Sequence, residues 1–354
     1  VYKSPNDDNG YDISDYRDIL KEFGTLEDFK ELVRGLKERN IRLIMDLVAN
    51  HTSDEHRWFL ESQKSKDNPY RDYYIWAKGK GKDGRKAPNN WTSRFVGPAW
   101  EYDELTGEFY LHLFSRKQPD LNWDNPKVRQ EIIDICNYWF EMGVDGFRCD
   151  VITYISKDMS LPDGKFNIAL IGDEHFTIGP NCHRYLRELN EKSWSLHDSM
   201  IVGEAIGITF EDAPTIIDER RKELDTIFNF EHMETDMYFQ CIPHKFRLSR
   251  FKKILSKWQT LPVTCWNSLY LENHDQPRSL PRFMSDLSCR KQGAKMLATT
   301  LMLQKGTPYI YQGQEIGMTN CDFNREDYQD ILATRIFDLA GKFPPLMPLA
   351  ERAM

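Results

Sequence analysis

The sequence predicts an α/β fold in which parallel strands close into a barrel and helices pack around the outside. Two observations support this prediction. Short apolar runs alternate along the chain with helical segments, and several of those runs lead into an acidic residue where a strand would end. Barrels of this kind gather their functional groups at the carboxyl ends of the strands. An open, doubly wound sheet is the competing arrangement, because it is built from the same strand-then-helix units.

Two helices are predicted from apolar periodicity and from residues that favour helix ends. Thr25 opens the first, since apolar side chains recur at helical spacing over residues 26–36. Asn125 and Pro126 begin the second, and Gly143 ends it.

The predicted strands are short apolar runs. In chain order they are 41–45 ending in Asp46, 144–149 ending in Asp150, 200–203 ending in Glu204, 227–230, 269–270 near Asp275, and 307–311. Between residues 52 and 117 the helical rhythm breaks into a polar stretch that is too long for an ordinary loop. We therefore expect a small inserted domain there, after the third strand of the barrel.

The inserted stretch contains a G-x-G-x-x-G pattern at residues 79–84 that could suggest a nucleotide site. No helix is expected after it, because Pro88 and two asparagines follow, and lysines surround it. We interpret the pattern as a solvated hairpin or turn and not as a phosphate-binding loop. A Rossmann-like oxidoreductase has only this pattern in its favour.

Charge, hydropathy and cysteine spacing exclude several classes of partner. The 47 basic residues against 55 acidic ones give a net charge of −8, which argues against nucleic acid. No apolar run of about 18 residues occurs and the first residues lack the features of a signal peptide, so we expect a soluble, unexported protein without a membrane partner. The seven cysteines are scattered and never in C-x-x-C spacing, which predicts no disulfide framework, no metal or other cofactor, and a cytoplasmic location.

Three acidic residues near different strand ends, Asp150, Glu204 and Asp275, are the candidates for catalysis. A single acid at a strand end is more often a helix cap or a solvent-facing charge, but in a barrel these three would meet in one pocket. Arg148 precedes Asp150 by two residues, so both side chains share one face of the strand and the cation can hold Asp150 ionised. A charged nucleophile beside a protonated acid is the pair that glycoside hydrolysis needs. His51 is a further candidate, as a hydrogen-bond donor to sugar hydroxyls.

The segments at these strand ends resemble the motifs of the α-amylase family of glycoside hydrolases. In that family DxxxNH, GxRxD, GE and NHD occur in this order on barrel strands three, four, five and seven. Here they read Asp46 with Asn50-His51, Gly146 with Arg148 and Asp150, Gly203-Glu204, and Asn273-His274-Asp275. QPDLN at 118–122 and GTPYIYQGQE at 306–315 resemble the end of that family's inserted domain and its eighth strand. The resemblance extends from residue 1 to about residue 330.

The resemblance implies a role for each matching residue. Asp150 attacks the anomeric carbon, and Glu204 protonates the departing oxygen and then activates water, so that the anomeric configuration is retained. Asp275 is the third acid, which grips hydroxyls of the distorted ring. The implied substrate-binding residues are His51, Arg148 and His274 in the first glucose subsite, with Tyr11 as a stacking platform and Asp12 as the acid that closes the pocket around a terminal glucose.

Residues 6–33 resemble the oligo-1,6-glucosidase and α-glucosidase branch, which trims single glucoses from short chains. Val151, directly after the nucleophile, is similar to members that cut α-1,6 bonds, where α-1,4 cutters usually carry Ala or Thr. A β-branched residue also simply suits a strand. Phosphotrehalose hydrolases share this valine, and sucrose isomerases share much of the frame, so these substrates stay open. A non-catalytic homologue that binds or chaperones a partner is the alternative of another class, although such homologues typically lose catalytic residues that are present here.

The chain begins where the family's second strand should be ending, so the resemblance implies a barrel that is incomplete at the N-terminus. We divide the chain into residues 1–51, from the end of strand two through strand three; 52–117, the inserted domain; 118–330, strands four to eight; and 331–354, a tail without resemblance to the family. A barrel that lacks strands leaves unpaired edges. We therefore expect the parent protein to be a glycosidase and the isolated 354-residue chain to be inactive.

Overall fold

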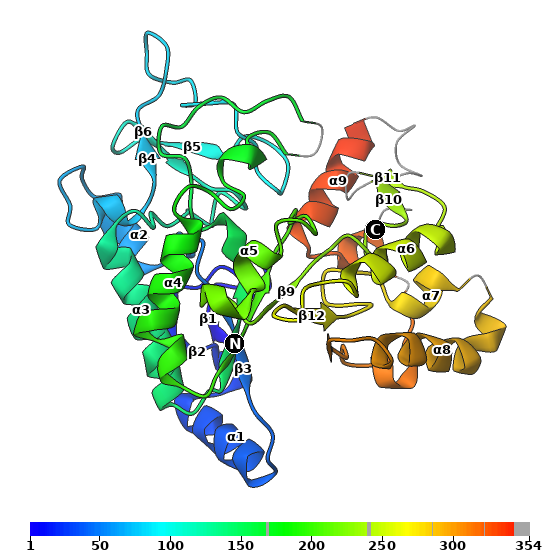
Figure 1. The fold of residues 1–354 in the computed structure, drawn as a ribbon. Coiled ribbons are helices and arrows are strands. Elements are labelled where there is room, and N and C mark those ends of the chain that lie inside the picture. The colour runs from blue at the N-terminus through cyan, green and yellow to red at the C-terminus, as the bar shows by residue number, and fades with distance from the viewer. Residues whose placement is uncertain (168–169, 239–241, 285, 322, 343–354) are drawn as a thin grey trace.

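A six-stranded parallel sheet forms the centre of the molecule (Figure 1). The computed structural model describes residues 1–167, 170–238, 242–284, 286–321 and 323–342. In sheet order the strands are β13 (Thr307–Pro308), β12 (Trp266–Leu269), β9 (Thr226–Phe228), β8 (Met200–Glu204), β7 (Gly146–Asp150) and β3 (Ile44–Val48).

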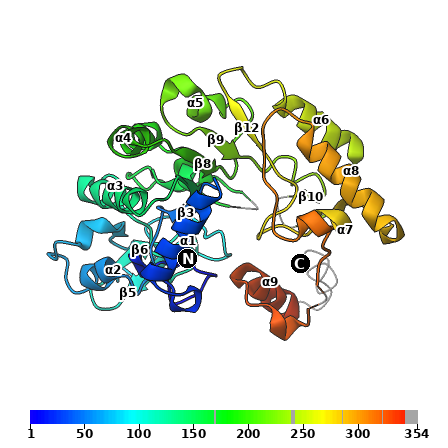
Figure 2. The ribbon, with the colours of Figure 1, turned by 90° about the horizontal axis from the view of Figure 1, so that it is seen from below.

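The strand order distinguishes a barrel from a doubly wound sheet. Each of these strands pairs in parallel with the next one along the chain, and the order never reverses. A doubly wound sheet would reverse its order at a switch point in the middle. Viewed from below, the strands follow an arc with helices on its outer side (Figure 2). The predicted barrel class is therefore confirmed, and among the described residues the sheet stays open, with β3 and β13 as its edges.

Helices connect and cover these strands. They are α1 (Leu26–Glu38), α2 (Arg57–Ser62), α3 (Pro126–Glu141), α4 (Cys182–Lys192), α5 (Pro214–Ile217), α6 (Leu248–Trp258), α7 (Ser279–Phe283), α8 (Arg290–Met302) and α9 (Ile331–Lys342). None of the helices in the described ranges is long and apolar enough to span a membrane.

Both predicted helices are confirmed, and their end signals explain their boundaries. The Thr25 hydroxyl accepts the backbone N–H of Asp28, and the Asp28 carboxylate accepts the N–H of Thr25 in return. The Asn125 side chain accepts the N–H of Lys127 at the start of α3, where proline fills the first helical position. Gly143 follows the end of α3 with a left-handed φ of 100°.

Two predicted strands lie elsewhere than expected. Asp46 sits in the middle of β3 and not at its end, because Leu47 and Val48 continue the ladder with β7. Strand β12 runs over 266–269, earlier than the apolar pair at 269–270. One of its polar side chains is satisfied inside the sheet, since the hydroxyl of Ser268 lies 2.9 Å from that of Thr226. The apolar pair at 269–270 indicated only the end of this strand, because two of its three buried side chains, Asn267 and Ser268, are polar.

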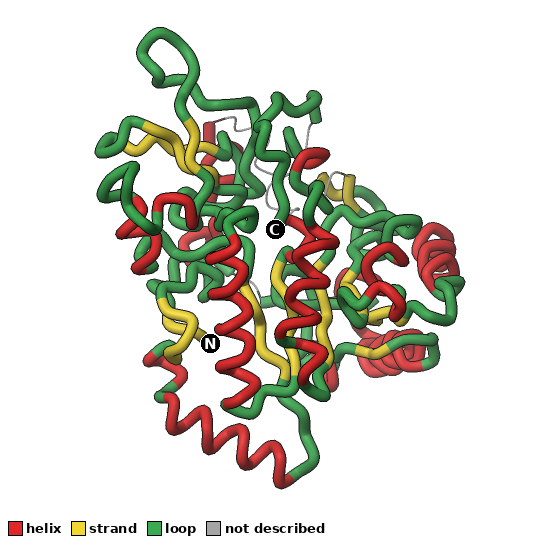
Figure 3. The backbone as a smooth tube through the Cα atoms, turned by 60° about the vertical axis from the view of Figure 1, so that its left-hand side comes forward, coloured by secondary structure: helices red, strands yellow, loops and turns green. Residues whose placement is uncertain are grey.

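Within residues 52–117 a separate antiparallel sheet forms from β4 (Trp76–Ala77), β6 (Glu108–Leu111) and β5 (Trp100–Asp103), shown in yellow at the top of Figure 3. The glycine-rich pattern lies in a hairpin in which Lys80 pairs with Lys86, as interpreted from the sequence. His51 and Asp120 are joined by an isolated bridge, so the stretch leaves and rejoins the rest of the chain at neighbouring points. The domain boundaries themselves stay a prediction.

Two further strand pairs are antiparallel: β1 (Tyr2–Lys3) with β2 (Asp15–Ile19), and β10 (Met237–Tyr238) with β11 (Ile242–Pro243). Of the tail predicted over 331–354, the described part is mainly α9, and residues 343–354 lie outside the described residues. Arg335 of α9 donates to the backbone carbonyls of Phe95 and Val96, which links this helix to the inserted stretch.

Candidate active site

Strand register brings the candidate residues of β3, β7 and β8 together. Asp46 lies opposite Arg148, and Cys149 lies opposite Gly203. Asp150 and Glu204 each follow the Cys149–Gly203 pair by one residue, so two acids that are 54 positions apart in sequence leave neighbouring strands side by side. Both are buried, with 7% and 4% of their surface exposed.

One guanidinium joins three carboxylates at this point. Nη1 of Arg148 lies 3.0 Å from Oδ1 of Asp46 and 2.6 Å from Oδ1 of Asp150. Nη2 of Arg148 lies 2.8 Å from Oε2 of Glu204. The prediction that Arg148 and Asp150 share one strand face is confirmed by this contact. The planar fork of arginine makes these contacts through two nitrogens in a fixed geometry, whereas a lysine ammonium is a single charged centre on a flexible stem.

Burial raises the pKa of Asp150 well above its usual range, and the cation of Arg148 opposes this shift. The negative charge of Glu204 raises the pKa of Asp150 further. Two acids this close beside a single cation favour one proton held between them, because a second bare negative charge would be repelled. Arg148 opposes but does not cancel the upward shift, so the expectation that its cation alone holds Asp150 ionised is not met.

An aromatic pair borders the carboxylates. The Tyr11 hydroxyl donates to Oδ2 of Asp46 over 2.8 Å and lies 3.0 Å from Nε2 of His274. The two rings stack with centroids 5.7 Å apart and planes 9° from parallel. Burial and the charge of Asp46 raise the pKa of Tyr11, so the phenol keeps its proton. Together these contacts place Tyr11 and His274 beside the arginine cluster.

Asp275 lies beyond the end of β12, next to His274. Its Oδ2 is 3.3 Å from Nε2 of His274, and about half of its side chain (52%) is open to solvent. Partial desolvation raises the pKa of Asp275, His274 opposes the shift, and the charge of Glu204 adds to it. The third acid is therefore within electrostatic reach of Glu204, but its carboxylate is more exposed than those of the pair.

His51 is buried behind Tyr11. Its Nε2 lies 3.2 Å from the carbonyl oxygen of Tyr11 and 3.3 Å from Nε2 of Gln118. Burial lowers the pKa of His51 to about 4, so the ring is neutral near pH 7. Gln118 also donates to the carboxylate of Asp8 over 2.8 Å, and burial raises the pKa of Asp8 to about 6.

Two predicted substrate-binding residues have other contacts. Asp12 is fully buried, and its carboxylate accepts hydrogen bonds from the Ser4 hydroxyl and from the backbone N–H groups of Asp7 and Asp8. This carboxylate holds its own loop. Val151 has 3% of its surface exposed and belongs to a cluster of buried apolar residues that includes the core of the inserted sheet. The substrate roles of both residues stay predictions.

Sequence reasoning missed several polar residues that support the site. Gln118 and Asp8 form the chain of contacts to His51 described above. Lys157 donates to the Asn50 side chain over 2.7 Å and lies 2.8 Å from Oδ2 of Asp120. A lone lysine at the end of the apolar stretch ITYIS is the one local signal that could have indicated a buried cation. Among the described residues, no group of three or more His, Cys, Asp or Glu side chains is arranged to hold a metal ion.

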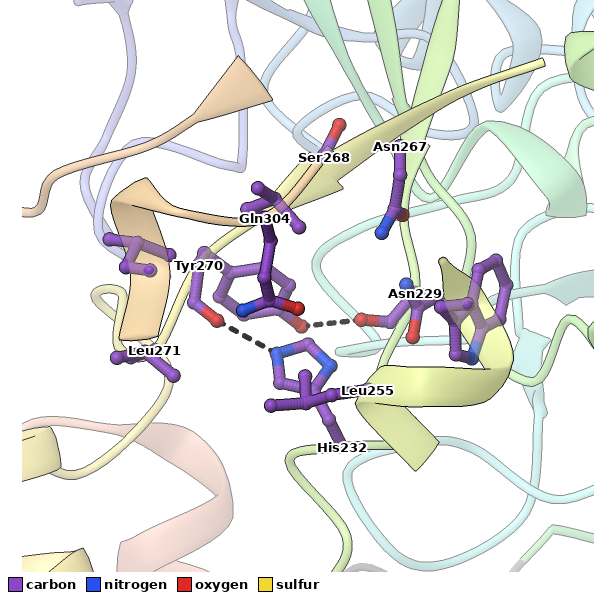
Figure 4. Close-up of a pocket in the computed structure, with 11 residues that line it drawn as sticks. Asn229, His232, Leu255, Asn267, Ser268, Tyr270, Leu271 and Gln304 are labelled. Carbon is purple, nitrogen blue, oxygen red and sulfur yellow. Dashed lines mark hydrogen bonds between the residues drawn. The ribbon is translucent and has the colours of Figure 1, made fainter. Parts of the chain in front are cut away.

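A small internal pocket lies between β12 and α6, and none of the candidate carboxylates lines it (Figure 4). His232 contacts the carbonyl of Tyr270 over 2.8 Å, and the Tyr270 hydroxyl donates to the carbonyl of Asn229. The side-chain oxygens of Asn229 and Asn267 have no partner among the described residues. A cavity of about 10 Å³ with two free acceptors suits a single buried water molecule.

Fold and site together define a class: a parallel β/α-barrel protein whose acidic site lies at the carboxyl ends of its strands. The model of the alpha-amylase catalytic domain matches residues 1–339. The chain therefore belongs to the alpha-amylase family, as the motifs implied.

Individual relatives are similar to this chain in sequence and in structure. An oligo-1,6-glucosidase of Parageobacillus thermoglucosidasius is 55% identical over 340 residues, which cover 94% of this chain and 60% of that protein. The crystal structure of a trehalose-6-phosphate hydrolase of Bacillus licheniformis superposes with a TM-score of 0.91 at 44% identity, over 99% of this chain and 63% of that one. A trehalulose synthase of Pseudomonas mesoacidophila gives a TM-score of 0.90 at 44% identity, over 95% and 61%. The chain thus spans about 60% of the length of these relatives.

Proposed function

We propose that the protein to which this chain belongs is a retaining, exo-acting α-glucosidase that removes terminal α-1,6-linked glucose from short oligosaccharides. The observation that carries the proposal is the pair Asp150 and Glu204, side by side on adjacent strands and both in contact with Arg148. The identity to oligo-1,6-glucosidases supports the substrate class. Residues 1–339 match a catalytic-domain model, which favours an enzyme over a non-catalytic binding subunit.

The proposed reaction is a double displacement. A carboxylate oxygen of Asp150 attacks the anomeric carbon while the carboxyl of Glu204 gives its proton to the departing glycosidic oxygen. Glu204 then takes a proton from a water molecule, which attacks the same carbon and releases glucose with its configuration retained. The contact of both carboxyls with one guanidinium keeps them close together and so favours this route, because inverting enzymes separate their carboxyls by roughly 6.5–9.5 Å to admit a water between them.

In this proposal Asp275 binds hydroxyls of the distorted ring, and Arg148 stabilises the ionised nucleophile. Tyr11 and His274 form the wall against which the terminal glucose stacks. His51 is neutral, so it can share hydrogen bonds with sugar hydroxyls without adding charge. Asp12 acts by holding the loop that carries Tyr11, in addition to its implied role in closing the pocket.

The linkage preference rests on Val151 and on the relatives. The similarity to oligo-1,6-glucosidases supports an α-1,6-linked substrate such as isomaltose. The similarity to a trehalose-6-phosphate hydrolase and to a trehalulose synthase leaves phosphotrehalose and sucrose as alternative substrates. Initial rates of the full-length protein on isomaltose, maltose, sucrose and trehalose 6-phosphate distinguish these. Equal rates on isomaltose and maltose would remove the argument from Val151.

The catalytic assignment is tested with Asp150→Asn and Glu204→Gln in the full-length protein. We expect each to lower kcat/KM on isomaltose by roughly 10³-fold or more, because the nucleophile or the proton donor is lost. Hydrolysis that survives in Asp150→Asn would contradict the mechanism. A non-catalytic binding subunit would instead show no hydrolysis in the parent and unchanged partner binding in the variant.

We also propose a cytoplasmic location and an oligosaccharide as the partner of the site. The six cysteines among the described residues are free, and a reducing compartment would keep them so.

A further inference from the structure

Val151 adopts a backbone conformation that its residue type disfavours. Its φ is 35° and its ψ is 39°, which lie in the left-handed region. A β-branched side chain is a rare occupant of this region, because its Cβ substituents crowd the backbone. Strain of this kind persists only where the surrounding structure holds it, and it gathers at functional sites. Because Val151 directly follows Asp150, we connect its strained backbone conformation with the candidate active site.

The packing around Val151 holds this turn in place. The side chain is buried, and the carbonyl of Val151 accepts the N–H of Tyr154, which closes the 3-10 turn at Ile152–Tyr154. On the neighbouring strand, Gly203 leaves room for this turn. A Cβ added at Gly203 would lie 2.9 Å from Cγ2 of Ile152 and 2.5 Å from Cδ1 of Leu224. The glycine before Glu204 thus lets the chain after Asp150 pack closely against β8.

The turn directs the backbone N–H of Val151 toward the carboxyl of Glu204. The N–H of Val151 donates to Oε2 of Glu204 over 3.2 Å. The same oxygen is 2.8 Å from Nη2 of Arg148. Both contacts are to Oε2, and neither is to Oε1. In a protonated carboxyl one oxygen carries the proton and donates, while the other is the natural acceptor.

We infer that the backbone amide of Val151 is a positioning group that selects which oxygen of Glu204 delivers the proton. This inference rests on the proposed function. With Oε2 held as acceptor by Val151 and Arg148, the proton resides on Oε1. It passes from there to the glycosidic oxygen as the bond from that oxygen to the anomeric carbon breaks and Asp150 bonds to the carbon. The electron pair of the broken bond stays on the protonated leaving oxygen, and Oε1 is left as the base for the second step.

The decisive experiment deletes the N–H and keeps the side chain. Val151 is replaced by its α-hydroxy analogue in the full-length protein. The peptide bond between Asp150 and Val151 then becomes an ester, which has no N–H. The readout is the ratio of kcat/KM on isomaltose to kcat/KM on 4-nitrophenyl α-glucoside, because the aryl leaving group needs little protonation. We expect the ratio to fall roughly tenfold, the size of a lost hydrogen bond to an ionisable group.

Two variants complete the test. Val151→Gly keeps the N–H and accepts the left-handed region without strain, so its ratio should stay near that of the parent although the lost side chain lowers both rates. Gly203→Ala should lower the ratio, because the added methyl pushes the turn away from Glu204. This variant replaces the ester protein as the test if the ester protein does not fold. A ratio that stays unchanged in both the ester and Gly203→Ala proteins, whether or not the two rates fall together, would overturn the inference. A parent protein inactive on both substrates would instead refute the proposed function.

Discussion

Lys157 and Asp120 form an ion pair in the interior, with Nζ 2.8 Å from Oδ2 and side chains that are 1% and 0% exposed. Asp120 also accepts the backbone N–H of Leu113 and the side-chain amide of Asn50. Burial lowers the pKa of Lys157, and the charge of Asp120 opposes the shift. The pair joins the chain after β7 to the point where the inserted stretch returns to the sheet, directly behind His51.

Removal of the lysine should therefore be costly. Lys157→Met leaves the Asp120 carboxylate buried without its cation, and we expect the free energy of unfolding to fall by roughly 3–5 kcal/mol. Denaturant unfolding of the full-length protein measures this. The matched control is Lys192→Met, which breaks an exposed pair with Glu188 and should cost less than about 1 kcal/mol. Equal losses in the two variants would show that the buried pair contributes nothing special.

Arg148 should not tolerate lysine. Arg148→Lys keeps the charge but loses the fork that contacts Asp46, Asp150 and Glu204 together. We expect kcat/KM on isomaltose to fall by roughly 10²-fold or more. Arg85→Lys, at an exposed pair with Glu104, is the control and should leave the rate unchanged. A rate for Arg148→Lys within a few fold of the parent would mean that charge alone is sufficient.

Acid should destabilise the protein through its buried histidines. Burial lowers the pKa of His232 to about 4, against about 6.5 in an unfolded chain. Between these values the unfolded state binds more protons, so stability falls as the pH drops from 6.5 toward 4. His232→Gln should make this fall shallower by on the order of 3 kcal/mol in unfolding experiments across that range. An equally steep fall in parent and variant would show that the ring below Tyr270 in Figure 4 is not responsible.

The isolated 354-residue chain should be inactive and prone to association. Among the described residues, the sheet ends at β3 and β13 without closure. Large apolar side chains near the second edge are exposed, including Leu303 at 81% and Ile316 at 71%. Unpaired edges and apolar surface favour aggregation. Light scattering should show species larger than the monomer, and release of glucose from isomaltose by the purified chain would refute the expected inactivity.

Local patterns predicted much of the fold. Three of these patterns act over a few residues and can be recognised from neighbouring side chains: the Thr25 cap, the Asn125-Pro126 start of α3, and the acids that end β7 and β8. The strand at 266–269 was predicted too late in the chain, at 269–270, because Asn267 and Ser268 are buried but polar. The contact of Ser268 with Thr226 that compensates for the burial of this hydroxyl is made across 42 positions. The family motifs predicted which acids form the candidate site, but not how they are held.

The order of apolar runs and acids predicted parallel strand-then-helix units and the candidate residues Asp150, Glu204 and Asp275, because periodicity and strand ends are local properties of a chain. The strand order in the structure then excluded the doubly wound sheet. Only the tertiary structure decided that a single guanidinium contacts three carboxylates, that Lys157 is buried against Asp120, and that the Val151 amide reaches Glu204. These contacts depend on strand register and on the packing of a turn against a neighbouring strand. Such relationships arise between segments that are distant in sequence, so no pattern within either segment encodes them.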